Sequence, residues 1–232
     1  RIGPICEEHG VPLFCDAAES LGASHAGRPA GSFGRASVFS FNGNKIMTTS
    51  GGGMFVTDDE KLAQHVRYLS TQARQPVVHY EHTDIGYNYR MSNLLAALGR
   101  AQLSRLGDMV ARRRQWRRRY REFFTDVPGV DIFGGAHDEE DNFWLSSIVI
   151  NADKTGVHAL EVQSRLNARG IESRPMWKPM HLQPVFASAS HLVNGSSEFL
   201  FVNGLTLPSG SSMSESEFSR VLSAMEDALM SA

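Results

Sequence analysis

The alternation of hydrophobic and polar positions in the first part of the chain predicts helices and short strands in turn. Residues 2–9 have helix-compatible spacing, and Gly10 is a natural helix stop. The apolar run at residues 11–15 predicts a short, buried strand that ends at Asp16, and residues 36–41 predict a second strand. Helix followed by strand is typical of doubly wound α/β domains, where ligands gather at the carboxyl edge of the strands. We therefore expect Asp16 to lie at such an edge.

The same pattern continues with a strand, a helix and a loop. Residues 54–56 predict a third short strand, and residues 60–70 predict a helix with Asp58 and Asp59 as its N-terminal caps. Residues 71–89 hold little periodicity and several histidines and tyrosines. We expect them to form a long ordered loop, and such loops in compact domains are usually functional or mobile.

Helical periodicity is strongest in residues 92–124, where apolar residues recur at a spacing near 3.6 and a break is expected near Gly107. Seven arginines crowd this segment: Arg112, Arg113, Arg114, Arg117, Arg118, Arg119 and Arg121. A basic helix can bind nucleic acid. The balanced charge of the chain favours the alternative that these arginines fill the solvated face of an amphipathic helix.

The remaining sequence predicts a second, smaller α/β domain. We expect strands at residues 142–150, 171–174 and 205–207, and helices at residues 157–168 and 214–229. Residues 136–141 form an acidic loop in this interpretation. The chain is therefore divided into residues 1–107 and residues 108–232.

Composition excludes several classes of protein. The 232 residues are 41% hydrophobic and 21% charged with a net charge of -2, which indicates neither nucleic acid nor an anionic membrane as partner. No apolar run approaches the roughly 20 residues that span a bilayer. Cys6 and Cys15 are too few for a disulfide framework, and Cys15 fits a small buried thiol, so we expect a reducing, cytoplasmic setting. Because the chain opens at Arg1 and not at a methionine, we expect either that the numbering begins inside a longer protein or that the molecule is a fragment.

Lys45 and Asp16 are the residues that could carry chemistry. Lys45 follows a predicted strand in a polar turn, where a lysine with restricted access can form a Schiff base; the alternative is an ordinary surface lysine. Asp16 could pair with a pyridinium nitrogen, or it could cap a helix that begins at Ala17. Ser40 and the glycines at 51–53 could approach a phosphate closely.

Several sequence blocks together resemble one family, the DegT/DnrJ/EryC1/StrS aminotransferases. The blocks are DAAESLGA at 16–23, GSFG at 31–34, SFNGNK at 40–45, GYNYRMS at 86–92, RPMWKPMH at 174–181 and GLTLPS at 204–209. They occur in the family's order and span nearly the whole chain. The resemblance implies an α/β fold of the type I pyridoxal-phosphate-dependent transferases. Residues 1–107 would be the C-terminal part of the cofactor-binding large domain, with a mixed sheet, and residues 108–232 the small α/β domain.

The resemblance also assigns roles at the cofactor. Lys45 would form the internal Schiff base with pyridoxal phosphate and later carry the proton between the substrate carbon and the cofactor. Asp16 would pair with the pyridine nitrogen, and Glu19 would lie near the phenolic side of the ring, unless it is simply a first-turn helix residue. Ser40 would donate a hydrogen bond to the phosphate. Asn88 would reach the phosphate in the partner's site, so the active sites would be shared across a homodimer.

Roles at the substrate are implied in the same way. Trp177 and His181 would lie near the substrate pocket, although each could instead be a packed core residue. Residues 42–49 resemble the branch that acts on UDP-linked 4-keto-6-deoxy-N-acetylhexosamines in bacillosamine-type and exopolysaccharide pathways. Glutamate would donate its amino group to the cofactor, which would then aminate the sugar ketone, with C4 as the expected position.

Other functions remain open within the same fold. Some relatives are sugar dehydratases in which histidine replaces the lysine, and Lys45 argues against that chemistry. A regulatory or binding protein of this fold is a second alternative, and a catalytically silent fragment is a third. The family's N-terminal portion supplies a phosphate-cradling turn and a ring-stacking aromatic residue. Without it, we expect weak or absent cofactor binding and abnormal association through an exposed sheet edge.

Overall fold

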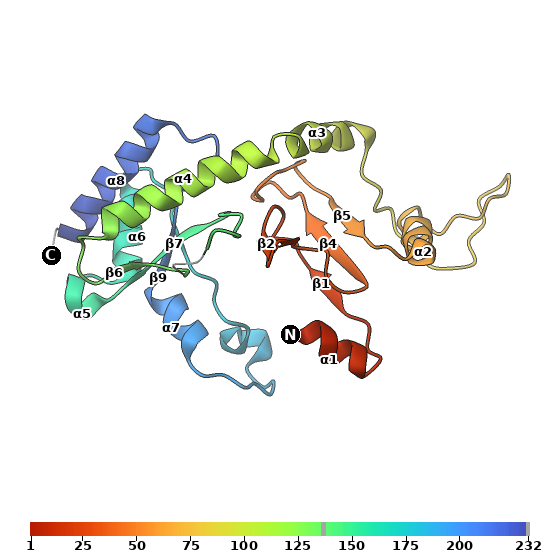
Figure 1. The fold of residues 1–232 in the computed structure, drawn as a ribbon, viewed down its shortest axis with the longest axis horizontal. Coiled ribbons are helices and arrows are strands. Elements are labelled where there is room, and N and C mark those ends of the chain that lie inside the picture. Colours follow the sequence, from red (N-terminus) through yellow and green to blue (C-terminus); the bar gives the residue numbers. More distant parts are fainter. Residues whose placement is uncertain (136–137, 231–232) are drawn as a thin grey trace. The chain divides into compact units, whose positions relative to one another are not determined.

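The structure is a computed structural model that describes residues 1–135 and 138–230. Two residues of the predicted acidic loop, 136 and 137, therefore lie outside the described residues. The backbone divides into two units, and Figure 1 labels most of their helices and strands. Unit 1 comprises Arg1–Val110 and Glu139–Asn142, and unit 2 comprises Ala111–Asp138 and Phe143–Ala232.

Unit 1 is built on a small mixed sheet in which β1 (Phe14–Asp16), β4 (Ala36–Ser40) and β5 (Gly53–Val56) lie side by side (Figure 1). The strand order is β1-β4-β5, with β1 parallel to β4 and β5 antiparallel to β4. Helix α1 (Ile2–Glu8) precedes β1, and a short antiparallel hairpin of β2 (Ser24–His25) and β3 (Arg28–Pro29) follows it. The mixed sheet confirms the predicted α/β class.

The prediction of a buried strand at residues 11–15 is wrong in two respects. Strand β1 begins only at Phe14, because Pro12 has no N–H to donate to a ladder. The Phe14 side chain is 54% exposed. The preceding helix, α1, has no buried residue, so it does not pack over this side chain as a core helix would. Cys15 is half-buried, and both cysteines are free thiols.

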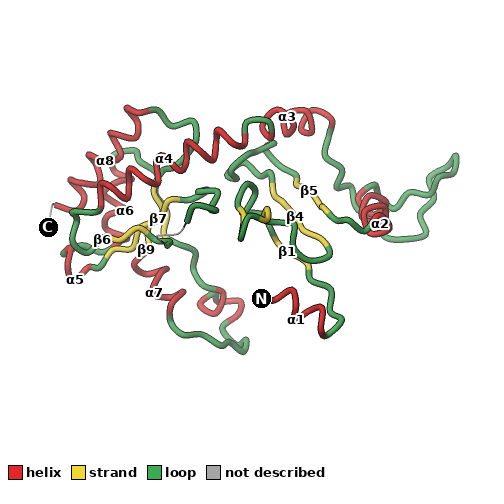
Figure 2. Tube along the Cα trace, viewed as in Figure 1, coloured by secondary structure: helices red, strands yellow, loops and turns green. Residues whose placement is uncertain are grey.

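The helices of unit 1 follow the predicted pattern closely. Helix α2 spans Glu60–Ser70, and the Asp59 carboxylate caps it by accepting a hydrogen bond from Leu62 N at 3.0 Å. Helix α3 spans Asn93–Leu103. Between α2 and α3 the chain forms a long loop, which Figure 2 draws in green, held by isolated bridges such as Thr71 to Asn88. The predicted loop at residues 71–89 is therefore confirmed.

Helix α4 (Leu106–Phe124) carries the arginine cluster. The expected break lies between α3 and α4, so Gly107 falls within the first turn of α4. The prediction that all these arginines are solvated is wrong for two of them. Arg113 and Arg117 are only 8% and 5% exposed.

The two buried arginines act as ties within unit 2. Arg113 donates to the carbonyl oxygens of Trp144 at 2.7 Å and Ser209 at 3.2 Å, and burial lowers its pKa. Arg117 donates to the carbonyl oxygen of Phe133 and pairs with Asp138 at 3.3 Å. Buried charges are tolerated when they are paired or hydrogen-bonded, so these two arginines hold loops against α4.

Unit 2 contains a four-stranded antiparallel sheet with the strand order β6-β7-β9-β8. Its strands are β6 (Val130–Ile132), β7 (Ser146–Ile150), β8 (Arg174–Pro175) and β9 (Gly204–Leu207). Its further helices are α5 (Ala152–Thr155), α6 (Ala159–Ala168), α7 (Ser196–Asn203) and α8 (Glu215–Met230), with short 3-10 turns at Met180–Leu182 and Pro184–Phe186. The predicted strands at 142–150 and 205–207 and both predicted helices are confirmed within a few residues. The strand predicted at 171–174 is wrong, because β8 covers only Arg174–Pro175.

The core of unit 2 joins the inner faces of α4, α6 and α8 to the sheet. Its fully buried side chains include Trp116, Tyr120, Ile148, Leu166, Leu205 and Phe218. Helix α7 was not expected, because its apolar residues, Phe199–Val202, are consecutive and resemble a strand rather than an amphipathic helix. Among the described residues, no helix combines the length and the apolar character that crossing a bilayer requires.

Candidate active site

Two parallel strands bring the predicted cofactor residues to one edge of the sheet in unit 1. Asp16 is the last residue of β1 and is aligned with Val38 of β4, and Ala17 N donates to Val38 O at 2.9 Å. Ser40 is the last residue of β4. Because the strands are parallel, both carboxyl ends face the same edge, as the sequence predicts.

Lys45 and Glu19 connect the loops that leave these two strands. Lys45 lies in the turn after β4, where its N–H donates to Asn42 O at 3.1 Å. Its Nζ is 3.1 Å from Glu19 Oε1, in the turn after β1. The Lys45 side chain is 12% exposed and that of Glu19 is 47% exposed. The amine is thus shielded and paired, unlike that of a fully exposed surface lysine, and the cofactor role of Lys45 stays a prediction.

The helical alternatives for Asp16 and Glu19 are also wrong. No helix begins after Asp16, and Glu19 does not lie in a helix, because β1 continues into a non-helical turn. Asp16 Oδ1 accepts a hydrogen bond from Ala18 N at 3.1 Å, which makes it a turn-stabilising carboxylate. Both residues are exposed, Asp16 at the end of β1 and Glu19 in the turn after it, where side chains can meet a ligand.

The sheet requires glycine at one position of the glycine-rich segment. Gly53 pairs with Ser40 across β4 and β5. A Cβ at Gly53 would lie 2.4 Å from Phe39 O, so only glycine permits this close pairing. Ser40 Oγ is 3.4 Å from Asn42 N, from which it accepts. The glycine therefore helps to hold Ser40 at the end of its strand.

The remaining predicted site residues lie elsewhere in the chain. Asn88 is exposed on the long loop, bridged to Thr71, and the structure does not join it to the Lys45 cluster. Trp177 belongs to unit 2 and is 65% exposed, so the alternative that it is a core residue is wrong; its ring lies 5.9 Å from that of Trp144. The substrate role of Trp177 and the partner-site role of Asn88 stay predictions.

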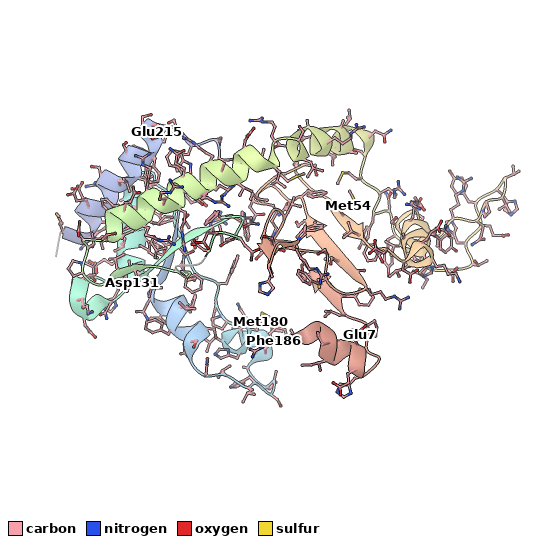
Figure 3. The ribbon with its side chains drawn as sticks, viewed as in Figure 1. Glu7, Met54, Asp131, Met180, Phe186 and Glu215 are labelled. Carbon is pink, nitrogen blue, oxygen red and sulfur yellow. The ribbon has the colours of Figure 1, made fainter. Side chains whose placement is uncertain are left out.

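His181, also in unit 2, lies in the first of the two 3-10 turns, which Met180 and Phe186 mark in Figure 3. Its ring stacks on His191 at 5.5 Å, and its Nε2 is buried without a hydrogen-bond partner in the described residues. A buried, unpartnered ring nitrogen is compatible with a ligand-facing role and equally with packing. The predicted substrate role of His181 stays a prediction.

The structure adds two residues to the surroundings of the site that sequence patterns did not reveal. Residues 139–142 return to unit 1, where the Glu140 carboxylate accepts from Ser24 Oγ, Ala26 N and Gly27 N at 3.0, 2.8 and 2.7 Å. Asn142 Nδ2 donates to the main-chain oxygens of the turn that carries Glu19. No local signal marks these contacts, because their partners are more than a hundred residues away in the sequence.

Replacing Glu140 by glutamine is expected to lower the melting temperature near neutral pH and to have little effect in acid. Hydrogen bonds from the N–H groups of Gly27 and Ala26, then the Ser24 hydroxyl and the charge of His25, hold the pKa of Glu140 below its usual value of 4.5. The ionised carboxylate therefore stabilises the native state above about pH 4.5, and this contribution is lost as the pH falls through the native pKa. Thermal unfolding of both proteins from about pH 7 to about pH 3 measures it. A difference in melting temperature that does not change with pH would contradict this assignment.

The donor set at the sheet edge has a definite chemical character. It combines one shielded primary amine, two carboxylates and one hydroxyl, from Lys45, Asp16, Glu19 and Ser40. An amine of this kind can attack an aldehyde, a carboxylate can pair with a protonated ring nitrogen, and a hydroxyl can donate to a phosphate. Within residues 1–135 and 138–230, no group of three histidine, cysteine or acidic residues is arranged to hold a metal ion.

A profile of the DegT/DnrJ/EryC1/StrS aminotransferase family matches residues 1–226. The chain belongs to this family. The relative EpsN of Bacillus subtilis, a predicted pyridoxal phosphate-dependent aminotransferase, is 45% identical over 226 residues, which are 96% of this chain and 58% of EpsN. GDP-perosamine synthase of Caulobacter vibrioides is 34% identical over 235 residues, covering 97% of this chain and 61% of that enzyme. The chain thus spans about three fifths of the length of these relatives.

The fold of this family member also matches solved structures. The crystal structure of DesI in the presence of its TDP-sugar product superposes with a TM-score of 0.84 and 32% identity, over 98% of this chain and 58% of DesI. This likeness confirms the predicted α/β fold of the type I aminotransferases. The family assignment accounts for the sequence blocks around Asp16, Ser40 and Lys45.

Proposed function

We propose that this protein is a pyridoxal-phosphate-dependent aminotransferase that transfers an amino group from glutamate to the keto group, at C4, of a nucleotide-linked 4-keto-6-deoxy sugar. The proposal rests first on one observation, the shielded Lys45 amine paired with Glu19 at the carboxyl edge of two parallel strands. Family membership supports the reaction class. The product would serve polysaccharide or glycan biosynthesis at the cell surface.

The residues at this edge fit the family's cofactor. When bound, pyridoxal phosphate supplies the electron sink that lets an amino group leave one substrate and enter another. Lys45 provides the amine that holds the cofactor aldehyde and afterwards moves a proton at the reacting carbon. Asp16 keeps a proton on the ring nitrogen, Glu19 orients the amine, and the Ser40 hydroxyl donates to the phosphate. Each of these groups lies at the end of β1 or β4 or in the turn that follows.

The assembly that we propose is a homodimer with shared active sites. Unit 1 would belong to the cofactor-binding large domain, and unit 2 would be the small domain. The exposed position of Asn88 on the long loop suits a residue that acts at a partner's site. The substrate roles of Trp177 and His181 belong to the same proposal, as does the cytoplasmic setting inferred from the two free thiols.

The names of the relatives support a nucleotide sugar as substrate and leave the nucleotide to experiment. One relative is a GDP-perosamine synthase, and the DesI crystal structure is one in the presence of its TDP-sugar product. The sequence around Lys45 resembles the branch that uses UDP-linked N-acetylhexosamines, so we propose the UDP-linked sugar as the preferred substrate.

Transfer of 15N from labelled glutamate tests this function. The protein is incubated with pyridoxal phosphate, 15N-glutamate and, in parallel, UDP-, GDP- and TDP-linked 4-keto-6-deoxy sugars. The expected result is a 15N-amino sugar nucleotide, formed fastest from the UDP-linked sugar and absent with Lys45→Ala. A protein that binds the sugar nucleotides without transferring 15N would instead be a silent or regulatory member of the fold.

A further inference from the structure

Asn142 has an unusual position for a polar residue near a proposed catalytic lysine. Its side chain is buried, with 3% of the residue exposed. The side-chain amide donates to Glu19 O at 2.8 Å and to Leu21 O at 3.0 Å. Both partners are carbonyl oxygens, which only accept, so only the NH2 group of Asn142 can serve both.

These two hydrogen bonds complete the support of the turn that carries Glu19. The start of the turn is tied to β4 by Ala17 N, which donates to Val38 O at 2.9 Å. Leu21 packs against an apolar cluster that includes Phe41 and Met47. These cluster residues lie on either side of Lys45 in the sequence. The polar side of the turn is held by Asn142.

The support bears directly on the lysine, because the same turn presents the Glu19 carboxylate to Lys45 Nζ at 3.1 Å. Glu19 is 47% exposed on its side chain, so packing alone does not hold it in one place. An exposed ion pair between mobile side chains contributes little stabilising free energy, and the pair is more stable when one partner is held in position. Fixing the Glu19 main chain removes part of the freedom that opposes pairing.

We propose that Asn142 is a positioning residue for the reactive lysine: it holds the Glu19–Leu21 turn so that the Glu19 carboxylate meets Lys45. The inference rests on the proposed function only in giving Lys45 a catalytic role. The pairing itself can be measured without cofactor.

The first test measures how fast each lysine is acylated. Lys45 is shielded, whereas Lys61, Lys154 and Lys178 are exposed and serve as internal references. Asn142→Asp keeps the shape of the side chain and removes both donors. We expect acylation of Lys45, followed by peptide mass spectrometry, to rise about fivefold, the factor that corresponds to one net hydrogen bond. The reference lysines should keep their rates.

A matched control removes a different hydrogen bond of the same segment. Ser24→Ala deletes the 3.0 Å contact between Ser24 Oγ and Glu140 and leaves the Glu19 turn untouched. We expect no change at Lys45 in this variant. An equal rise in Ser24→Ala and Asn142→Asp would show that any loosening of residues 139–142 exposes the lysine, and the inference would be wrong.

A double-mutant cycle separates positioning from general structural support. In Glu19→Ala the carboxylate is gone, so adding Asn142→Asp should change the Lys45 rate by less than about twofold. If the two substitutions instead multiply their effects, Asn142 does not act through Glu19. Asn142→Ala, which removes both donors without adding a charge, should raise the Lys45 rate by a similar factor. If both Asn142 variants lose the far-ultraviolet circular dichroism of the parent, unit 1 has unfolded, Asn142 is a general structural residue, and the inference fails.

Borohydride trapping of pyridoxal phosphate distinguishes this inference from the proposed function. If the parent protein traps cofactor on Lys45 and acylation is unchanged in Asn142→Asp, the positioning role alone is rejected. If neither the parent nor a chain extended upstream of Arg1 traps cofactor while acylation of Lys45 rises as expected, the proposed function is rejected and the structural coupling of Asn142 to Lys45 stands.

Discussion

Replacing Lys45 by alanine is expected to abolish specific covalent capture of pyridoxal phosphate by this protein. The Lys45 side chain is 12% exposed and its amine lies beside Glu19 at the end of two parallel strands, whereas the exposed Lys61 lies on α2. A Schiff base needs an amine with restricted access beside groups that hold the cofactor. The visible band of lysine-bound cofactor and borohydride trapping with peptide mass spectrometry measure the capture. The label in Lys45→Ala should fall to the level of the exposed lysines.

The control for this experiment is Lys61→Ala, which should keep the band and the label. Bleaching of the band on adding glutamate would support glutamate as amino donor. If the parent shows no band, the measurement is repeated on a chain extended upstream of Arg1. A band that survives in Lys45→Ala would contradict the assignment of Lys45. The absence of a band in both this chain and the extended chain would reject the proposed catalytic function.

Replacing Trp116 by alanine is expected to destabilise unit 2 by about 3–5 kcal/mol, the range for a large aromatic residue removed from a core. Trp116 is fully buried, its ring stacks on Phe218 at 4.5 Å, and its Nε1 donates to Gly210 O at 3.1 Å. The Arg112 guanidinium lies 4.0 Å from the ring centroid and pairs at 3.0 Å with Glu215, which Figure 3 labels at the start of α8. Urea denaturation followed by far-ultraviolet circular dichroism measures the loss.

Leu160→Ala provides the matched control for Trp116→Ala. Leu160 lies on α6 of the same unit but is 62% exposed, so its truncation should change the free energy of unfolding by no more than about 0.5 kcal/mol. If Trp116→Ala proves as mild as Leu160→Ala, the stacked cluster around Trp116 is not the centre of this core.

The predictions that succeeded concern groups whose placement depends on near neighbours in the sequence. Helix α2 has the predicted bounds because its apolar spacing and the Asp59 cap are local signals. Asp16 and Ser40 lie at one edge because each ends a strand, and parallel strands share their carboxyl edge. The family blocks further identified Lys45, which the chain composition alone could not distinguish from an ordinary surface lysine.

The predictions that failed concern burial, which depends on distant contacts. An apolar run predicted that Phe14 is buried, yet its strand lies at an edge of the sheet. Their charge predicted that Arg113 and Arg117 are solvated, yet both are buried inside unit 2, where they donate hydrogen bonds to carbonyl oxygens from distant loops. Hydrophobic periodicity reports the face that a residue occupies and carries no information about what covers that face.

The sequence by itself determined most of the helices and strands and the family, because propensity, periodicity and motifs are local properties of the chain; it also predicts which residues hold a lysine-bound cofactor. Only the tertiary structure decided that Lys45 pairs with Glu19, 26 residues away, and that Asn142 holds the Glu19 turn from 123 residues away. Such contacts form when a long loop closes and buried polar groups find their partners, and neither event leaves a periodic signal in the sequence.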